Sequence, residues 1–298
     1  MALNDDINAY WNTRASGYGA DIAQEIRDDR KGTLAMLDHL LTQHFALKLP
    51  AVVKNDAETG TTPPLQGFHA LDLGCGPALL SMHLAQLGCT VTAIDQSTEM
   101  LTQAKQHCEQ FLMPQAQQRV HLQQGDAINP DVPNESFDLV VSRDVFWNLP
   151  DPATAYHHAL QALKPHGLMV VFDGNYYYGY ADRAYHKDYR LNHQHLEGVD
   201  VTIIERLAQD LPLSYQLRPQ YDFALINQLC EQDEALKQCL TASAYIKDNT
   251  PTPDITWLIF QDYPDFGKSP AIQVMPAERK PFLAEQLIEN FVFVVQKA

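Results

Sequence analysis

The sequence predicts an α/β protein with a mostly parallel, doubly wound sheet. Short apolar runs alternate with helical stretches between residues 68 and 173. The first run ends in the glycine turn Gly74-Cys75-Gly76, and the next one closes on an acidic residue, Asp95. Strands that alternate with helices form βαβ units, which pack as parallel sheets with right-handed crossovers.

Composition indicates an ordinary globular protein and excludes some partners. The 298 residues are 45% hydrophobic, which is ample for a core, and the formal net charge is −16. This charge would repel nucleic acid and anionic membrane surfaces. No apolar run is long enough to span a bilayer, so we expect a cytoplasmic protein with no membrane partner. The 5 cysteines are odd in number and form no C-x-x-C pair, which argues against a disulfide framework or a zinc site.

The N-terminal region reads as a helical cap. Leu34, Leu37, Leu41 and Phe45 recur at helical spacing within residues 3–49, Gly17 and Gly19 mark an interruption, and Pro50 ends the run. The polar stretch 55–67 is a connector. We therefore expect residues 1–64 to form the cap and linker, with a boundary near Leu65.

Residues 65–173 form the predicted core. Gly88 stops the first helix, Ser97 is the expected N-cap of the second, and Asp151 with Pro152 opens the third. The expected strands are 68–73, 89–95, 120–125, 137–142 and 168–173, and the expected helices are 77–87, 97–112 and 151–163.

The pattern is less regular beyond Asp173. We expect an inserted lid over residues 174–217, with helical character at 199–213, and the rest of the core sheet over residues 218–298. In that last part, 221–231 reads as a helix, 239–246 as a strand, and Phe291 to Val295 as a strong final strand. The proline-rich segment 250–280 permits no assignment.

The glycine turn predicts a nucleotide-like ligand. Gly74 and Gly76 allow bare backbone to approach a ligand, and the N–H groups of the following helix point toward it. A dinucleotide fingerprint, G-x-G-x-x-G, would need a third glycine where Leu79 stands. Asp95 could accept hydrogen bonds from ribose hydroxyls, or could simply cap the next helix.

Five motifs over residues 65–175 resemble those of class I S-adenosylmethionine-dependent methyltransferases. They are Leu71 to Gly76, Val91 to Asp95 followed by Ser97, Met100 and Leu101, Gly125-Asp126-Ala127, Phe137 to Arg143, and Leu163-Lys164-Pro165-His166-Gly167. His166 stands where this family usually has glycine. The opening Tyr10 to Tyr18 also resembles the W-x-x-R-A-x-x-Y start of small-molecule members, of the methyltransferase type 11-like branch.

The resemblance implies a Rossmann-like sheet of seven strands in the order 3-2-1-4-5-7-6, with Phe291 to Val295 as the antiparallel seventh. It implies S-adenosylmethionine as methyl donor and S-adenosylhomocysteine as product, with adenine near Asp126 and Ala127, ribose on Asp95, and the methionine part against Gly74 and Gly76. The donor-binding residues that it implies are Tyr10, Arg14, Tyr18, Asp72, Gly74, Cys75, Gly76, Asp95, Gln96, Met100, Asp126, Ala127 and Arg143.

Two stretches at strand ends, Arg143 to Leu149 and Asp173 to Tyr178, resemble the acceptor-side motifs S-R-N-x-x-W-x-L-P-D-P and D-x-N-W-Y. Asp144 replaces the usual Asn, and Tyr176 the usual Trp. Methyl transfer is an in-line displacement that depends mainly on alignment, so no universal catalytic residue and no metal is expected. The acceptor-side residues that the resemblance implies are Trp11, Asp144, Trp147, Asn175, Tyr176 and Tyr177.

The tyrosines of 176–189 could form an aromatic wall for a cationic or planar substrate, or a lid that packs its rings on the sheet. His186, His193 and His195 in the same insert match no metal-binding or catalytic motif.

The sequence therefore predicts a methyltransferase that acts on a small molecule. Two alternatives stay open, a protein that binds the donor without turnover and an NAD-type oxidoreductase. Nucleic acid methylation is disfavoured by the charge. The acceptor atom and the oligomeric state, including a homodimer, are left open.

Overall fold

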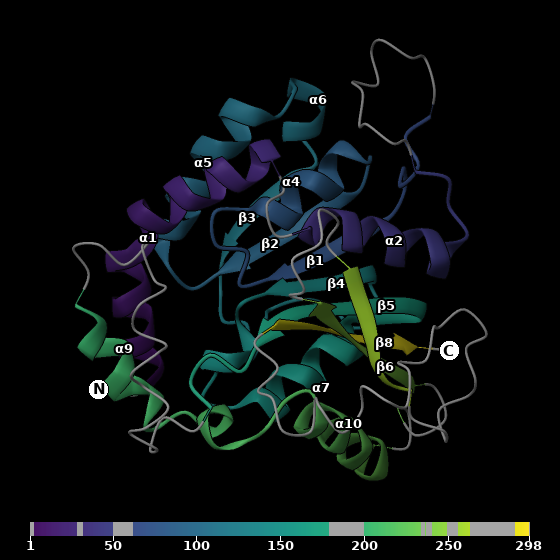
Figure 1. The fold of residues 1–298 in the computed structure, drawn as a ribbon. Helices are drawn as coiled ribbons and strands as arrows, with labels where there is room; N and C mark the ends of the chain where they lie inside the picture. The colour runs from purple at the N-terminus through teal and green to yellow at the C-terminus, as the bar shows by residue number, and fades with distance from the viewer. Residues whose placement is uncertain are drawn as a thin grey trace.

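A computed structural model describes residues 3–28, 32–49, 62–178, 200–233, 236, 240–248, 256–262 and 290–297. One sheet of eight strands runs through this described part, in the order β3-β2-β1-β4-β5-β8-β6-β7, with helices on both faces (Figure 1). The strands are β1 (His69–Leu73), β2 (Thr90–Asp95), β3 (Val120–Gln124), β4 (Phe137–Arg143), β5 (Leu163–Gly174), β6 (Leu240–Asp248), β7 (Thr256–Asp262) and β8 (Asn290–Lys297).

The first five strands are parallel, and the chain then reverses. Within the parallel part, Leu71 of β1 lies opposite Thr92 of β2 and Val140 of β4. β8 runs antiparallel to β5 and β6. The predicted order 3-2-1-4-5-7-6 is confirmed, with β8 in the place expected for strand seven. The predicted count of seven was one too low, because β7 adds an edge strand inside the proline-rich segment that we left unassigned.

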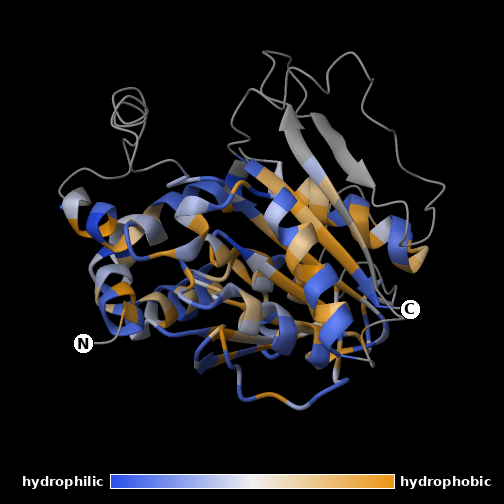
Figure 2. Cartoon of the chain, turned by 90° about the horizontal axis from the view of Figure 1, so that it is seen from below, coloured by the Kyte–Doolittle hydropathy of each residue, from blue (hydrophilic) through white to orange (hydrophobic). Residues whose placement is uncertain are grey.

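Alternating residues along each strand pack in two cores, one on each face of the sheet. Ala70 of β1 packs in the core shared with α2 (Thr33–Phe45) and α4 (Leu79–Gln86), whereas Leu71 packs in the core shared with α7 (Pro152–Ala162) and α10 (Gln220–Gln232). Figure 2 shows the central strands as largely hydrophobic bands beneath helices that carry many hydrophilic residues. The sheet is thus buried on both sides, as parallel sheets are.

Two predicted helix starts are confirmed by their caps. The Ser97 hydroxyl accepts a hydrogen bond from the Met100 N–H at the start of α5 (Thr98–Phe111). Asp151 accepts from the Thr154 N–H at the start of α7. The remaining helices are α1 (Leu3–Asp28), α6 (Pro114–Gln117), η1 (Phe146–Asn148), α9 (Val201–Ala208) and η3 (Pro212–Tyr215).

Two local predictions were wrong. α1 runs without interruption through Gly17 and Gly19, and a Cβ at Gly19 would lie 2.5 Å from Gln103 Oε1 of α5, so this glycine permits close helix packing rather than a break. Pro77 does not open a helix, because Ala78 takes a left-handed backbone (φ 68°) and α4 begins at Leu79. The motif 163–167, where the resembled family usually has a turn, is assigned to β5, but the pairing with β4 shifts register between Leu163 and Leu168 and His166 takes a left-handed backbone (φ 63°), so the chain bulges out there.

The two N-terminal helices, α1 and α2, pack against different parts of the molecule. α2 buries Leu37 and Leu41 in the sheet core, so the expected cap shares its core with the sheet. α1 packs along α5 and beside α9 (Figure 1). The division into a cap, a core, a lid and a C-terminal part stays a prediction. Residues 179–199 of the expected lid, with Tyr180, Tyr185, Tyr189 and the three histidines, lie outside the described residues.

Candidate functional site

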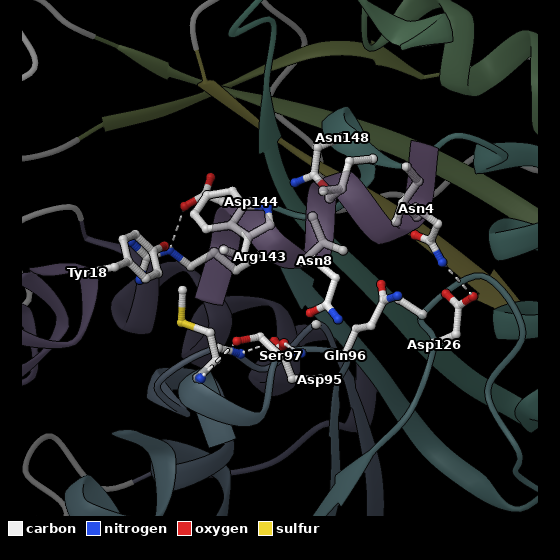
Figure 3. A pocket seen from close by; sticks show the side chains of 18 residues that line it. Asn4, Asn8, Tyr18, Asp95, Gln96, Ser97, Asp126, Arg143, Asp144 and Asn148 are labelled. Atoms are coloured by element: carbon white, nitrogen blue, oxygen red, sulfur yellow. Dashed lines mark hydrogen bonds and ion pairs between the residues drawn. The ribbon is translucent and has the colours of Figure 1, made fainter. Parts of the chain in front are cut away.

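A cleft lies between α1 and the carboxyl ends of the strands β1, β2, β3 and β4. It encloses about 650 Å³ of empty space, part of which is open solvent. Figure 3 shows Tyr18, Arg143 and Asp144 at one end of the cleft, Asn4 and Asp126 at the other, and Asp95 between them. The carboxyl ends of the strands are where ligands of doubly wound sheets bind.

The glycine turn after β1 forms the floor of the cleft. Gly74 has φ +66°, and a Cβ there would lie 2.4 Å from Cγ2 of Val145, so no side chain fits. Gly76 has φ +49° and lines the cleft, and a Cβ there would meet only the Tyr18 ring, at 3.8 Å. A ligand can therefore approach the backbone at Gly76 closely.

Asp95 holds this turn in place. Its two carboxylate oxygens accept hydrogen bonds from the N–H groups of Gly76 and Ser97, each at 2.8 Å. Burial raises the pKa of Asp95, and these two hydrogen bonds work in the opposite direction. The carboxylate thus joins β2, the glycine turn and the start of α5 at the middle of the cleft.

Helix α1 spans the cleft and is bonded to its rim at three places. Asn4 Nδ2 donates to Asp126 Oδ2 at 3.2 Å, and Asn12 Oδ1 accepts from the Ser97 hydroxyl at 2.6 Å. Near the other end of α1, Glu25 Oε2 accepts from Arg143 Nη2 at 2.8 Å. These three contacts make α1 the roof of the cleft.

Among the described residues, two buried polar atoms that belong to residues lining the cleft find no hydrogen-bond partner. They are Nη1 of Arg143 and Oδ1 of Asn8. The Arg143 side chain is only 8% exposed. Buried polar groups are almost always paired in folded proteins, so these two atoms indicate a ligand with complementary groups.

Asp144 dominates the other end of the cleft. Its backbone is left-handed (φ 57°), which Asp and Asn tolerate better than most residues. The carboxylate lies 2.5 Å from the Tyr176 hydroxyl and 3.3 Å from Nε of Arg143. Burial raises the pKa of the neighbouring Tyr18 phenol, and Asp144 raises it further, so Tyr18 stays protonated near neutral pH.

Most residues predicted to bind the donor come together in the cleft. Those that line it are Tyr18, Gly74, Gly76, Asp95, Gln96, Met100, Asp126, Ala127 and Arg143.

Tyr10, Arg14, Asp72 and Cys75 do not line the cleft. Arg14 is buried and donates to the Tyr10 hydroxyl at 3.0 Å. Asp72 accepts from Ser81 of α4, at 2.5 Å, and Cys75 packs in a core.

The residues predicted on the acceptor side also include some that line the cleft and some that do not. Trp11 and Asp144 line the cleft. Trp147 packs behind them, edge-on to Trp11 and stacked on Tyr177 with ring centroids 5.2 Å apart. Tyr176 does not line the cleft, but its hydroxyl donates a hydrogen bond to Asp144, which does.

Asn175 faces the interior. Its side-chain amide donates to the carbonyl of Arg218 at 2.7 Å and accepts from the N–H of the same residue at 2.9 Å. Its described contacts are therefore structural.

A buried ion network supports the acceptor end from below. Arg218 donates to Asp173 at 2.7 Å and to both oxygens of Asp222, and its guanidinium lies over the Phe291 ring. Burial raises the pKa of Asp173 to about 6 although Arg218 acts against this rise. Asp173 also accepts from the Trp147 N–H, which ties the loop after β4 to the end of β5.

Several residues that line the cleft were not predicted from the sequence. Asn4, Ile7 and Asn8 line the cleft with Trp11, and their spacing puts them on one face of a helix, which is the signal that could have found them. The others missed as site residues are Ser97, Val145, Asn148 and Leu149.

The described part of the chain contains neither a metal-binding cluster nor a membrane-spanning helix. Its Cys, His, Asp and Glu side chains form no group of three or more that could hold a metal ion. None of its helices is both long and apolar enough to cross a membrane.

The strand order of the sheet is the one expected for a class I methyltransferase domain. Residues 71–171 match the family model described as a methyltransferase domain. This part of the chain is a class I S-adenosylmethionine-dependent methyltransferase domain, and S-adenosylmethionine is the cosubstrate of such domains.

Curated relatives match over a part of their length. A ubiquinone biosynthesis O-methyltransferase from Paramagnetospirillum magneticum is 36% identical over 107 residues, which are 36% of this chain and 41% of the relative. One from Colwellia psychrerythraea is 31% identical over 129 residues, which are 43% of this chain and 48% of the relative. The chain therefore spans less than half the length of these relatives.

Solved structures resemble the chain more distantly. The YcgJ protein from Bacillus subtilis is 17% identical, with a TM-score of 0.45, and the match covers 77% of this chain and 91% of that one. An S-adenosylmethionine-dependent methyltransferase from Mesorhizobium loti is 24% identical, with a TM-score of 0.33 and coverage of 43% and 56%.

Proposed function

We propose that this protein transfers a methyl group from S-adenosylmethionine to a small molecule. The observation that carries the proposal is the cleft over the glycine turn, whose polar groups match the parts of this donor in order. Asp126 lies at one end for the adenine, Asp95 in the middle for the ribose, and Gly76 with Arg143 at the other end for the methionine part.

Arg143 replaces Arg14 in our assignment of the donor carboxylate. Arg14 was expected among the donor-binding residues, but its side chain is bonded to Tyr10 and does not line the cleft. Arg143 lines the cleft and keeps an unpartnered Nη1, which a carboxylate would satisfy with a charge-assisted hydrogen bond.

The chemistry requires alignment more than acid–base groups. Bound S-adenosylmethionine supplies an electrophilic methyl group on a sulfonium. The protein's part is to fix the donor on the glycine turn, to exclude water under α1, and to hold the acceptor in line. The names of the curated relatives suggest a hydroxyl group as acceptor, but the matched family model ends at residue 171, before Tyr176 and Asn290 of the acceptor end.

Calorimetric titration of the protein with S-adenosylmethionine and S-adenosylhomocysteine tests the proposal. Asp126→Ala removes the carboxylate at the adenine end, and we expect it to weaken both ligands at least tenfold, which is about 1.4 kcal/mol. Asp131→Ala, at an exposed residue outside the cleft, is the matched control and should leave both affinities unchanged. Absence of binding by the unmodified protein would refute the proposal.

Transfer itself needs a separate measurement. With S-adenosylmethionine labelled at the methyl group, label should appear in a small-molecule acceptor. Binding of the donor without transfer to any acceptor would favour the alternative of a binding protein without turnover.

A further inference from the structure

Asparagines recur at every fourth position of α1, as Asn4, Asn8 and Asn12. Residues four apart lie on the same side of a helix, so these three side chains follow one another along α1. The outer two are bonded to the rim of the cleft. Asn4 donates to Asp126 at 3.2 Å, and Asn12 accepts from the Ser97 hydroxyl at 2.6 Å. The middle one, Asn8, therefore lies over the part of the cleft between Asp126 and Ser97.

The side chain of Asn8 has a buried atom that needs a partner. Asn8 lines the cleft, and within the described part of the chain its Oδ1 is buried without a hydrogen bond. Figure 3 shows Asn8 over the middle of the cleft, across from Asp95 and Gln96. A buried amide oxygen without a partner is destabilising, because it has lost its water and gained no donor. A ligand that donates a hydrogen bond to this oxygen would remove the penalty.

The chemistry of this oxygen selects among the groups of the proposed methyl donor. An amide oxygen only accepts hydrogen bonds, so its partner must carry an N–H or O–H group. In the adenosine part of S-adenosylmethionine, these groups are the adenine amino group and the two ribose hydroxyls. The amino group is assigned to Asp126 at one end of the cleft, which leaves the ribose hydroxyls for the oxygen of Asn8 in the middle.

Asp95, on the floor of the cleft, has room for one more partner on each oxygen. Its two oxygens accept from the N–H groups of Gly76 and Ser97, one each. A carboxylate oxygen has two lone pairs, so each keeps one for a ligand. Two neighbouring hydroxyls of one ribose would therefore meet acceptors on opposite sides of the cleft, Asp95 below and Asn8 above.

We propose that Asn8 is a donor-binding residue that accepts a hydrogen bond from one ribose hydroxyl of S-adenosylmethionine, while Asp95 accepts from the other. This inference rests on the proposed function. It gives the ribose one anchor on β2 and a second on α1. Binding of the donor then fixes the middle of α1 over the cleft, between the positions of Asn4 and Asn12.

The experiment removes the acceptor and the hydroxyls in turn. S-adenosylhomocysteine and its 2′-deoxy and 3′-deoxy analogues are titrated by calorimetry into the unmodified protein and into Asn8→Ala. We expect Asn8→Ala to weaken S-adenosylhomocysteine about three- to tenfold, the range of one hydrogen bond. This loss should disappear for the analogue that lacks the hydroxyl bound by Asn8 and persist for the other analogue, as the coupling of two groups in contact requires.

Two further measurements separate ligand binding from stability. Because the Asn8 oxygen has no partner in the described part of the unliganded protein, Asn8→Ala should not lower the free energy of unfolding without ligand, and alanine in a helix favours a small gain. Thr13→Ala is the matched control, at an exposed polar residue of α1 that does not line the cleft. It should leave the affinities of all three ligands unchanged.

The outcomes distinguish this inference from the proposed function. Unchanged affinity of Asn8→Ala for S-adenosylhomocysteine would overturn the inference. An equal loss of affinity for all three ligands would overturn it as well, because Asn8 would then not act through a ribose hydroxyl. In both cases the proposed function stands. Failure of the unmodified protein to bind S-adenosylmethionine and S-adenosylhomocysteine would instead refute the proposed function, and this inference with it.

Discussion

The two ends of the cleft are built in different ways. The floor of the donor end is made by residues close in sequence, since Gly76 follows β1, Asp95 ends the adjacent strand β2, and the two are 19 positions apart. The acceptor end joins distant segments, since Tyr176 bonds Asp144 at a separation of 32 positions and Asn290 at 114. Short sequence motifs can therefore identify the floor of the donor end, whereas the acceptor end is assembled only by the complete fold.

The largest effect is expected from breaking the support of the acceptor end. Arg218→Met would leave the buried carboxylates of Asp173 and Asp222 without their cation, at a cost of about 3 to 5 kcal/mol in the free energy of unfolding. Urea denaturation measures this loss. Arg27→Met is a matched control, because Arg27 also lies over a phenylalanine ring, at 5.5 Å, but is exposed, so its loss should cost about 1 kcal/mol or less.

At the donor end, the substitution expected to have the largest effect on stability and on donor binding is at Gly74. Gly74→Ala would place a Cβ against Val145 in a left-handed backbone, and we expect a loss of about 2 to 4 kcal/mol together with loss of S-adenosylmethionine binding. Thermal unfolding and calorimetry test the two effects. Gly17→Ala, in an exposed part of α1 with no atom within 4 Å of the added Cβ, should instead gain up to about 1 kcal/mol. A stable Gly74→Ala protein that still binds the donor would contradict this account of the turn.

A smaller, pH-dependent effect is expected at Asp72, beneath the donor end. Burial raises its pKa to about 7 in the folded protein, from 3.8. The folded state therefore binds this proton more tightly, so the contribution of Asp72 to stability is complete below 3.8 and is lost as pH rises through about 7.

The variant Asp72→Asn tests this pH dependence. It retains an acceptor for the Ser81 hydroxyl but cannot ionise. The free energy of unfolding of the unmodified protein should fall by about 1.4 kcal/mol per pH unit between about pH 4 and pH 7 relative to that of the variant, and the difference should level off above pH 7. Parallel slopes of the two proteins across this range would show that Asp72 does not titrate there.

The same contrast between the two ends of the cleft explains which features can be predicted from the sequence. The caps at Ser97 and Asp151, the strand order and the convergence of Gly76, Asp95 and Asp126 are set by local signals and by the handedness of βαβ units, and the structure confirms the caps and the order. The roles of these residues in binding remain predictions until ligands are measured.

The rest depends on packing that no local pattern encodes. Gly19 reads as a helix breaker, yet it serves the contact of α1 with Gln103. Asn175 carries a motif resemblance, but its amide is bonded to the Arg218 backbone. Arg14 has the charge expected for a carboxylate partner, and only the path of α1 shows that Arg143 faces the cleft instead.

The hydrogen bond from Asn4 to Asp126 has a consequence for how the cleft fills. Under the proposed function, Asn4 in the first turn of α1 occupies the carboxylate that the adenine would bind. The end of a helix opens at little cost, because its terminal N–H groups have no partners within the helix. The adenine amino group would then replace the Asn4 amide as the hydrogen-bond donor to Asp126, while the bonds of Asn12 and Glu25 hold the rest of the helix in place.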